Sequence, residues 1–497
     1  MLDALRERLA VVSDLHSAAR VLEWDQETYM PAGAAEARAH QLATIKTLAH
    51  AHLVDDETAT LLAAVREDEL DDRVDLALVH VTRRDLERAS RRSPSLVARQ
   101  ARATARALEA WKRARAMDDF PHFAPHLNEI LDLAREEAEA LGYDEDPYDA
   151  LLEEFEPGMT HAQVERTFTA LRAELVPMVE AIAAAPPIDD GVLHRRFDLQ
   201  KQWDFGMDVA RAVGYDFEHG RQDRSTHPFS TSFASPFDVR ITTRLEEDFF
   251  SPAFFGTLHE VGHALYEQGI DPALARTPLA DGTSLGVHES QSRLWENLVG
   301  RSRPFWRWAY PLAQRTFPDI LADTSEEAFY RAANKVEPSL IRVEADEVTY
   351  SLHVMLRFEL ETALLSGDLP VSDLPAAWND RMQDYLGLTP DTDADGCLQD
   401  IHWAMGAIGY FPTYALGSLM SVQLWDAASL EMDDLEDQVA SGEFAPLLAW
   451  LRDKVHRHGR ARSAREIVED ASGEALSAQP WLAYARRKFG SLYGIDL

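Results

Sequence analysis

Cysteine is almost absent from this chain. Cys397 is the only cysteine among 497 residues, so no disulfide can form within the chain. Disulfides are typical of oxidising compartments, and a chain without them is typical of a reducing one. The sequence therefore favours a cytoplasmic protein in which Cys397 packs as a small apolar side chain.

Long apolar runs are also lacking. No stretch approaches the roughly 18 uncharged apolar residues that identify a membrane-spanning helix. Charged residues stand at positions 3, 6, 7 and 8, and no apolar segment typical of a secretory signal follows them. We therefore expect neither a membrane span nor a signal peptide.

Positive charge is scarce. The chain has 49 Lys and Arg against 85 Asp and Glu, a formal net charge of −36. A nucleic-acid-binding surface needs a basic cluster, and an anionic membrane attracts one, so neither partner is expected. The charge is typical of a soluble, self-repelling surface. Nearly all the cationic residues are Arg rather than Lys. A high-salt habitat and GC-rich codon usage explain this preference equally well.

Apolar residues recur every three or four positions through most of the chain, as in positions 95–119 and 161–185. This period is typical of amphipathic helices. The breaks are short and contain no low-complexity linker, so we predict one mostly α-helical domain over residues 1–497. The stretch FDVRITTRL (237–245) alternates with period two and predicts a strand. It belongs either to a cleft wall whose free edge binds an extended peptide or to a small supporting sheet.

The stretch GTLHEVGHALYEQG (256–269) contains two histidines four residues apart. On a helix, His259 and His263 lie on one face and can direct two ring nitrogens at one Zn²⁺ ion. Glu260 then lies close enough to take a proton from a water on the metal, which is the H-E-x-x-H mechanism. The alternative is an ordinary helix with two satisfied histidines and a solvated glutamate.

A third metal ligand is expected further along the chain. Glu289, 26 residues after His263, opens a second helical pattern in GVHESQSRLWENLVG. A glutamate on a neighbouring helix completes a His₂Glu site of the kind found in zinc peptidases. Glu296 is the second choice, and an acid favoured at a helix start is the alternative for Glu289. His288 is either a spare ligand or a hydrogen-bond donor to the reacting carbonyl.

With HEVGH and HESQSR taken together, the sequence resembles the carboxypeptidase Taq family of zinc metallocarboxypeptidases. The resemblance extends over essentially the whole chain. It includes these further stretches: LEWDQETYMPAG (22–33), YDALLEEFEPGM (148–159), STHPF (225–229), DVRITTR (238–244), IRVEAD (341–346), GCLQDIHW (396–403) and GYFPTYALG (409–417).

The resemblance implies a single, mostly helical domain with a long substrate groove and a small sheet beside a zinc-binding core at about 225–420. It also implies a cytoplasmic homodimer that releases single C-terminal residues with broad preference. One Zn²⁺ per chain is implied, with Co²⁺ able to substitute. Neither the working metal nor dimerisation follows from the residue pattern itself.

A carboxypeptidase must recognise a free C-terminal carboxylate, which arginine binds through a planar fork of donors. The resemblance makes Arg342 the anchor, and Arg240 is the competitor. Arg342, Asp346, Tyr350 and His353 follow helical spacing and predict one polar stripe on a helix. Asp346 is expected to orient either Arg342 or a metal-ligating histidine.

The reacting carbonyl needs a hydrogen-bond donor besides the metal. Tyr410 and Tyr414 lie in a Gly- and Pro-containing stretch that suits a mobile loop, and Tyr414 resembles the substrate-contacting tyrosine of the family more closely. His227 resembles a substrate-binding histidine. Packed tyrosines and an ordinary loop histidine are the alternatives.

The stretch GCLQDIHW predicts a helix that lines the groove with Gln399, Asp400 and His402. Asp400 is expected to fix a histidine tautomer. A buried network that only holds helices together is an equally good interpretation.

Two other functions remain open from the sequence. An oligopeptidase or dipeptidyl carboxypeptidase shares the His₂Glu site and differs in the distance between anchor and metal. A catalytically silent, zinc-stabilised binding scaffold has no use for Glu260 and usually fills the fourth position on zinc.

Overall fold

The structure, a computed structural model, describes all 497 residues. Its contacts group the chain into two compact units, and each unit is assembled from three separate segments. Unit 1 comprises residues 1–90, 189–333 and 420–476, and unit 2 comprises residues 91–188, 334–419 and 477–497. The expectation of a single domain over 1–497 stays a prediction.

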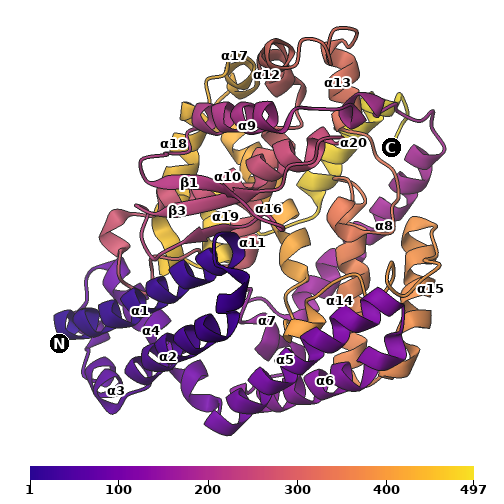
Figure 1. Cartoon of the computed structure of the whole chain (residues 1–497). Helices are drawn as coiled ribbons and strands as arrows, with labels where there is room; N and C mark the ends of the chain where they lie inside the picture. Colours follow the sequence, from indigo (N-terminus) through magenta and orange to yellow (C-terminus); the bar gives the residue numbers. More distant parts are fainter. The chain divides into compact units, whose positions relative to one another are not determined.

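Helices dominate both units, as the apolar periodicity predicts (Figure 1). Unit 1 contains these helices and strands: α1 (Leu2–Thr28), η1 (Ala32–Ala34), α2 (Ala35–Leu53), α3 (Asp56–Ala63), η2 (Glu67–Glu69), α4 (Arg73–Arg91), η3 (Gly191–His194), α9 (Leu199–Val213), β1 (Gly220–Arg224), β2 (Ser230–Ser232), β3 (Val239–Thr243), α10 (Phe250–Gly269), η4 (Pro272–Leu274), α11 (Leu285–Arg293), η5 (Leu294–Val299), α12 (Arg303–Thr316), α13 (Glu326–Ala333), α17 (Leu435–Ser441), α18 (Ala445–Lys454), η9 (His456–Ala461) and α19 (Ala464–Ser472).

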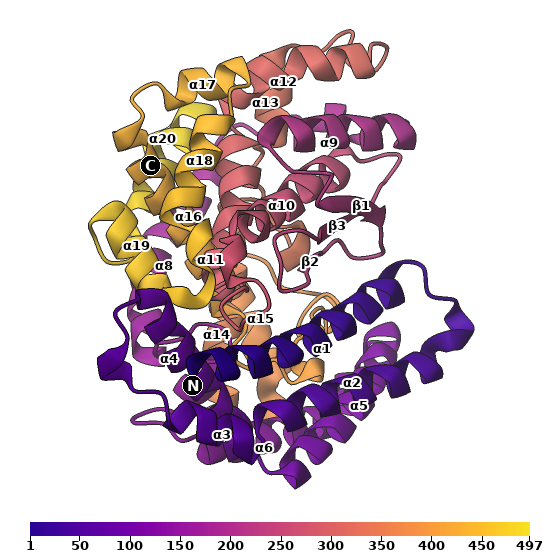
Figure 2. The same ribbon diagram turned by 90° about the vertical axis from the view of Figure 1, so that its left-hand side faces the viewer.

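Unit 2 contains helices and no strand. They are α5 (Pro94–Met117), α6 (Phe120–Leu141), α7 (Pro147–Leu152), α8 (His161–Ala183), η6 (Arg342–Glu344), α14 (Tyr350–Ser366), η7 (Val371–Asp373), α15 (Leu374–Leu386), η8 (Trp403–Met405) and α20 (Gln479–Tyr493). The helix α16 (Pro412–Glu431) begins in unit 2 and continues in unit 1. The long helices α5 and α6 lie side by side (Figures 1 and 2). None of the helices of the chain has both the length and the hydropathy needed to cross a bilayer.

The small sheet of unit 1 has the order β1-β3-β2 and packs against α10 (Figure 2). β3 pairs in parallel with β1, Gly220 opposite Val239, and antiparallel with β2, Ser230 opposite Ile241. The strand predicted at 237–245 is therefore confirmed, but it is the central strand. Both of its edges are hydrogen-bonded, which contradicts the interpretation of β3 as a free edge for an extended peptide.

Aromatic side chains fix α10 in the core of unit 1. Phe250 and Phe254 stack at 5.2 Å between ring centroids, and Phe205 stacks on Phe254 at the same distance. Trp306 of α12 packs on Phe254 at 5.5 Å and is fully buried, so the aromatic stretch of α12 belongs to the core. Because α10 is packed on several sides, side chains on its remaining face have little freedom to move.

Candidate active site

The helix α10 presents His259 and His263 one turn apart, as predicted from their spacing of four. Their ring centroids are 4.8 Å apart. The intervening Val261 and the following Leu265 are fully buried, which orients the histidine face of the helix. The two imidazoles are thus held by the core behind them.

A glycine lets the next helix approach this face closely. A Cβ on Gly262 would lie 2.5 Å from the backbone O of Gln291 and 2.6 Å from Cα of Ser292, both in α11. Any larger residue would therefore push α11 away from α10. The side chain of Ser284 begins α11 by accepting the backbone N–H of Val287 at 3.1 Å, which is typical of a helix N-cap.

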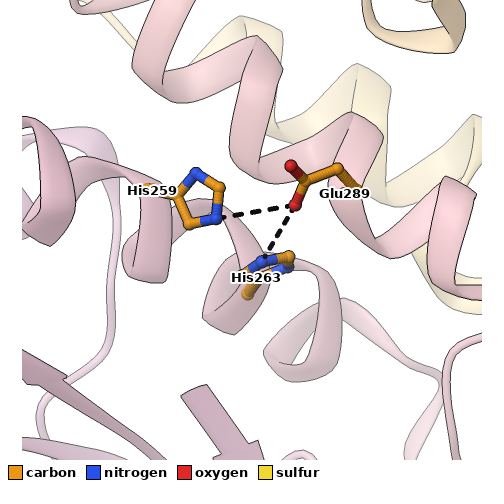
Figure 3. Close-up of side chains that lie close together, drawn as sticks. All are labelled: His259, His263 and Glu289. Carbon is orange, nitrogen blue, oxygen red and sulfur yellow. Dashed lines mark ion pairs between the residues drawn. The ribbon is translucent and has the colours of Figure 1, made fainter. Parts of the chain in front are cut away.

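This close packing brings Glu289 to both histidines (Figure 3). Its Oε2 lies 3.5 Å from Nε2 of His259 and 3.5 Å from Nε2 of His263. Three donors each about 2.1 Å from a tetrahedral zinc ion would be about 3.4 Å apart. The two spacings to Glu289 match this value, and all three donor atoms lie within 4.8 Å of one another, so the donor set suits one zinc-sized ion.

A second ring of polar contacts surrounds the three ligand side chains. Nδ1 of His259 lies 3.0 Å from Oε2 of Glu296, which is carried by the π-helical turn η5. Arg293 donates Nε to Oε1 of Glu289 at 2.7 Å and Nη1 to Glu296 at 3.4 Å, and Arg301 donates to Glu296 at 3.2 Å. Glu296 thus contacts one histidine, at Nδ1 of His259, whereas Glu289 lies near Nε2 of both histidines.

Burial and nearby charges act in opposite directions on these groups. Burial alone would raise the pKa of Glu296, but its hydrogen bond with His259 and the charge of Arg293 lower it to about 2. Burial alone would also raise the pKa of Glu289. The charges of Arg293 and His259 outweigh this effect and hold the pKa well below its usual range. Burial lowers the pKa of His263 to about 3, which keeps its imidazole neutral, the form that binds metal.

Glu260 is a buried acid on the same face of α10, with 6 % of its surface exposed. Burial raises its pKa to about 7. Glu289 and Glu296 are further carboxylates that contact the two histidines.

The structure contradicts the predicted contact between His288 and substrate. Nδ1 of His288 lies 2.6 Å from Nδ1 of His263, and Nε2 lies 2.8 Å from Oε1 of Glu267. Both ring nitrogens are therefore engaged within the protein, behind the ligand His263. His227 is exposed in the turn between β1 and β2, where its backbone O accepts a hydrogen bond from Ser225.

In unit 2, Arg342 is buried and bound to acidic and phenolic groups. Its Nε and Nη2 donate to Oδ1 of Asp400 at 3.1 and 2.8 Å, and its Nη1 donates to Oη of Tyr350 at 2.9 Å. Arg357 donates Nε to Oδ2 of the same Asp400 at 2.6 Å and is fully buried. Two guanidinium groups thus share one carboxylate, which leaves one positive charge in excess.

The predicted polar stripe on one helix is wrong, although the side chains of Arg342 and Tyr350 do meet. Arg342 lies in the short η6 turn, and α14 begins only at Tyr350. Asp346 accepts the backbone N–H groups of Val348 and Thr349 at 2.9 and 3.0 Å. Asp346 therefore fixes the turn before α14 and contacts neither Arg342 nor a metal-ligating histidine.

Residues 396–402 of GCLQDIHW lie in turns and irregular segments, and only Trp403 enters a helix, the short η8. Gln399 accepts the backbone N–H of Arg342 at 2.9 Å and so holds the η6 turn. Asp400 binds arginines, with its Oδ1 still 3.9 Å from Nδ1 of His402, which contradicts its expected role in fixing a histidine tautomer. Burial raises the pKa of the Cys397 thiol, in agreement with a packing role.

Tyr410 and Tyr414 border the same cluster. Tyr414 stands in the first turn of α16, with its Oη 3.3 Å from Nε2 of His402 and its ring 4.9 Å from the guanidinium carbon of Arg342. Tyr410 packs its ring at 5.2 Å from His402 and 5.3 Å from Tyr414. Arg240, the competing anchor, lies on β3 and instead pairs with Asp238, the residue before the strand.

Sequence reasoning missed two buried charged residues of α14. Arg357 is described above, and Glu361 accepts hydrogen bonds from Oη of Tyr148, Nε1 of Trp403 and the backbone N–H of Gly409 at 2.8, 2.8 and 2.7 Å. Glu361 thereby anchors the segment that leads to Tyr410. Both residues stand in the largely apolar run LHVMLRFELE (352–361), and charges at core-facing positions were the signal.

A helical fold, a His₂Glu donor set and an adjacent buried glutamate together define the class of H-E-x-x-H metallopeptidases.

Comparison with known proteins specifies the family. The family model described as carboxypeptidase Taq (M32) metallopeptidase matches residues 4–489. Thermostable carboxypeptidase 1 of Thermus thermophilus is 44 % identical, and the match covers 97 % of this chain and 96 % of the relative. Carboxypeptidase 1 of Bacillus subtilis is 38 % identical, with 97 % and 96 % covered. The chain therefore belongs to the carboxypeptidase Taq (M32) family and is a metallocarboxypeptidase, a peptide hydrolase.

Solved structures agree with this assignment. The M32 carboxypeptidase from Deinococcus radiodurans has a TM-score of 0.97 and 44 % identity, with 99 % of each chain covered. Metallocarboxypeptidase 1 of Trypanosoma cruzi has a TM-score of 0.91 and 32 % identity, also with 99 % of each chain covered. The predicted fold class, mostly α with a small sheet, is confirmed.

Proposed function

We propose that this chain is a zinc-dependent carboxypeptidase that releases single C-terminal residues from peptides with broad side-chain preference. The observation that carries the proposal is the spacing of 3.5 Å between Glu289 and each of His259 and His263. Catalytic zinc sites use three protein ligands, whereas structural sites use four. Co²⁺ accepts similar nitrogen and oxygen donors and is expected to substitute.

Glu260 is the proposed general base. Bound zinc supplies Lewis-acid polarisation of the scissile carbonyl and a lower pKa for the attacking water. Glu260 takes the proton of that water and passes it to the leaving amine. Its raised pKa, about 7, suits a group that must both accept and return a proton near neutral pH.

Arg342 is the proposed anchor for the terminal carboxylate of the substrate. The excess positive charge of Arg342 and Arg357 over Asp400 supports this role, because an incoming carboxylate would balance it. Tyr414, Tyr410 and His227 are the proposed donors to the substrate backbone. A cytoplasmic location and a homodimer are proposed from the family alone.

The test is a mass-spectrometric time course on two N-blocked peptides of identical sequence, one with a free C-terminus and one amidated. The carboxypeptidase should shorten only the free form, one residue at a time. Removal of two residues at a time, or internal cleavage of both peptides, would favour a dipeptidyl carboxypeptidase or an oligopeptidase. Glu260→Gln should keep zinc and lose turnover, whereas a silent scaffold would show no turnover to lose.

A further inference from the structure

A chain of hydrogen bonds extends from the proposed metal ligand His263 to the sheet. Nδ1 of His263 meets Nδ1 of His288 at 2.6 Å, and Nε2 of His288 meets Oε1 of Glu267 at 2.8 Å. Oγ of Ser232, on β2, donates to Oε2 of Glu267 at 2.8 Å. Glu267 and Ser232 are each 5 % exposed, so the outer part of this chain is shielded from water.

The carboxylate of Glu267 only accepts, which fixes the direction of its hydrogen bond with Nε2 of His288. In the neutral form of His288, Nε2 then carries the hydrogen and Nδ1 accepts. Nδ1 of His263 must then carry a hydrogen, which leaves the lone pair of its Nε2 directed toward Glu289. That is the tautomer a metal ligand needs.

We infer that His288 and Glu267 are positioning residues that hold His263 in its metal-binding tautomer and orientation. The inference rests on the proposed metal site and adds a determinant of its affinity. Outer partners that orient ligating histidines typically contribute about 10–100-fold to metal affinity. Usually the partner is a carboxylate, a carbonyl or water; here a histidine stands between the ligand and the carboxylate.

The two histidine ligands are held by different devices. His259 meets Glu296 directly, and the charge of Glu296 is countered by Arg293 and Arg301. Glu267 instead contacts the ring of His288, so its negative charge acts on His263 through that ring. The charge of Glu267 therefore strengthens the donor capacity of His263.

Local packing reserves the place of the intermediate ring. A Cβ on Gly282 would lie 2.8 Å from Cδ2 of His288 and 3.0 Å from Cε1 of Tyr266. The ring of Tyr266 packs on His288 at 5.1 Å, and its hydroxyl accepts the backbone N–H of Thr283 at 3.1 Å. Tyr266 thus contacts His288 without belonging to the hydrogen-bond chain, and it provides a matched control.

The experiment measures zinc affinity of the full-length apo protein by competition with a chromophoric chelator. His288→Phe keeps a ring of similar size and should weaken zinc binding about 10–100-fold. Glu267→Gln keeps an acceptor oxygen, loses the charge and should give a smaller loss. Tyr266→Phe removes a buried hydroxyl from α10, the helix that also carries Glu267 and His263. This variant should leave zinc affinity within about twofold of wild type.

The visible absorption spectrum of the Co²⁺-loaded protein is a second readout. The ligand-field bands should shift in His288→Phe and Glu267→Gln and stay unchanged in Tyr266→Phe. The inference would be overturned if His288→Phe and Glu267→Gln both kept the wild-type zinc affinity and Co²⁺ spectrum. An equal loss of zinc affinity in Tyr266→Phe would also overturn it. If the wild type itself binds no zinc, the proposed function fails. If His263→Ala abolishes zinc binding while His288→Phe and Glu267→Gln bind zinc as the wild type does, only the inference fails.

Discussion

Replacing Asp400 by Asn should destabilise the fold strongly, because two buried arginines depend on one carboxylate. Asp400 receives three charged hydrogen bonds, two from Arg342 and one from Arg357. The side chains of these arginines are 6 % and 0 % exposed, so water cannot replace the lost partner. Breaking a buried ion pair of this kind typically costs about 3–5 kcal/mol.

The assay is urea unfolding followed by tryptophan fluorescence. Trp378 is a suitable reporter, since the guanidinium carbon of Arg357 lies 4.5 Å from its ring centroid. The matched control is Asp238→Asn, which also breaks a two-pronged arginine pair but at a side chain that is 43 % exposed. We expect the control to cost less than about 1 kcal/mol. A loss below that value for Asp400→Asn would refute the electrostatic argument.

The same reasoning predicts a pH dependence with a definite sign. Burial alone would raise the pKa of Asp400, but the charges of Arg357 and Arg342 hold it well below its usual range. A carboxyl with a lowered folded-state pKa contributes stability above its unfolded pKa of about 3.9, and that stability is lost as the pH falls. Between about pH 5 and pH 2, the wild type should therefore lose more unfolding free energy than Asp400→Asn. Parallel curves would contradict this assignment.

Three further predictions concern the metal centre and its surroundings. Gly262→Ala should lower the zinc stoichiometry with helical circular dichroism retained, because a Cβ would meet the backbone O of Gln291 at 2.5 Å; full stoichiometry would speak against the close approach of α11. Glu361→Gln offers one acceptor oxygen where the carboxylate accepts three hydrogen bonds, and should cost about 1–3 kcal/mol in urea unfolding while raising KM through the segment leading to Tyr410. An unchanged KM would show that Glu361 does not affect substrate binding. Removing the metal with a chelator should lower the melting temperature, and zinc at 100 times its dissociation constant should restore about 2.7 kcal/mol; a melting curve insensitive to zinc would exclude a folded-state site.

The local part of the metal site was predictable from the sequence, because it depends on helix geometry. His259 and His263 share a face through a spacing of four, and this holds wherever the helix lies. Glu289 required a second step, since only packing places α11 against α10. Its position after a Gly-containing turn and at the start of a helical pattern was enough to select it.

The remaining contacts depended on tertiary structure that spacing does not encode. The polar stripe failed because the side chain of Asp346 binds the backbone before Tyr350, so the helix cannot begin earlier. The two nitrogens of His288 are engaged by residues 25 and 21 positions before it on α10, and no sequence rule links such pairs. The central position of β3 likewise follows from β2, a strand of only three residues.

The π-helical turn at Leu294–Val299 imposes a limit on insertions and deletions. A π turn accommodates one more residue than an α turn, so deleting one residue there would restore regular helical hydrogen bonding. Everything beyond the deletion would then rotate by about 100° about the helix axis. Glu296 or Arg301 would leave its partner, so a change that improves the helix would dismantle the support of His259. In this segment the number of residues is under tighter constraint than their identity. Homologues should therefore show substitutions there before they show insertions or deletions.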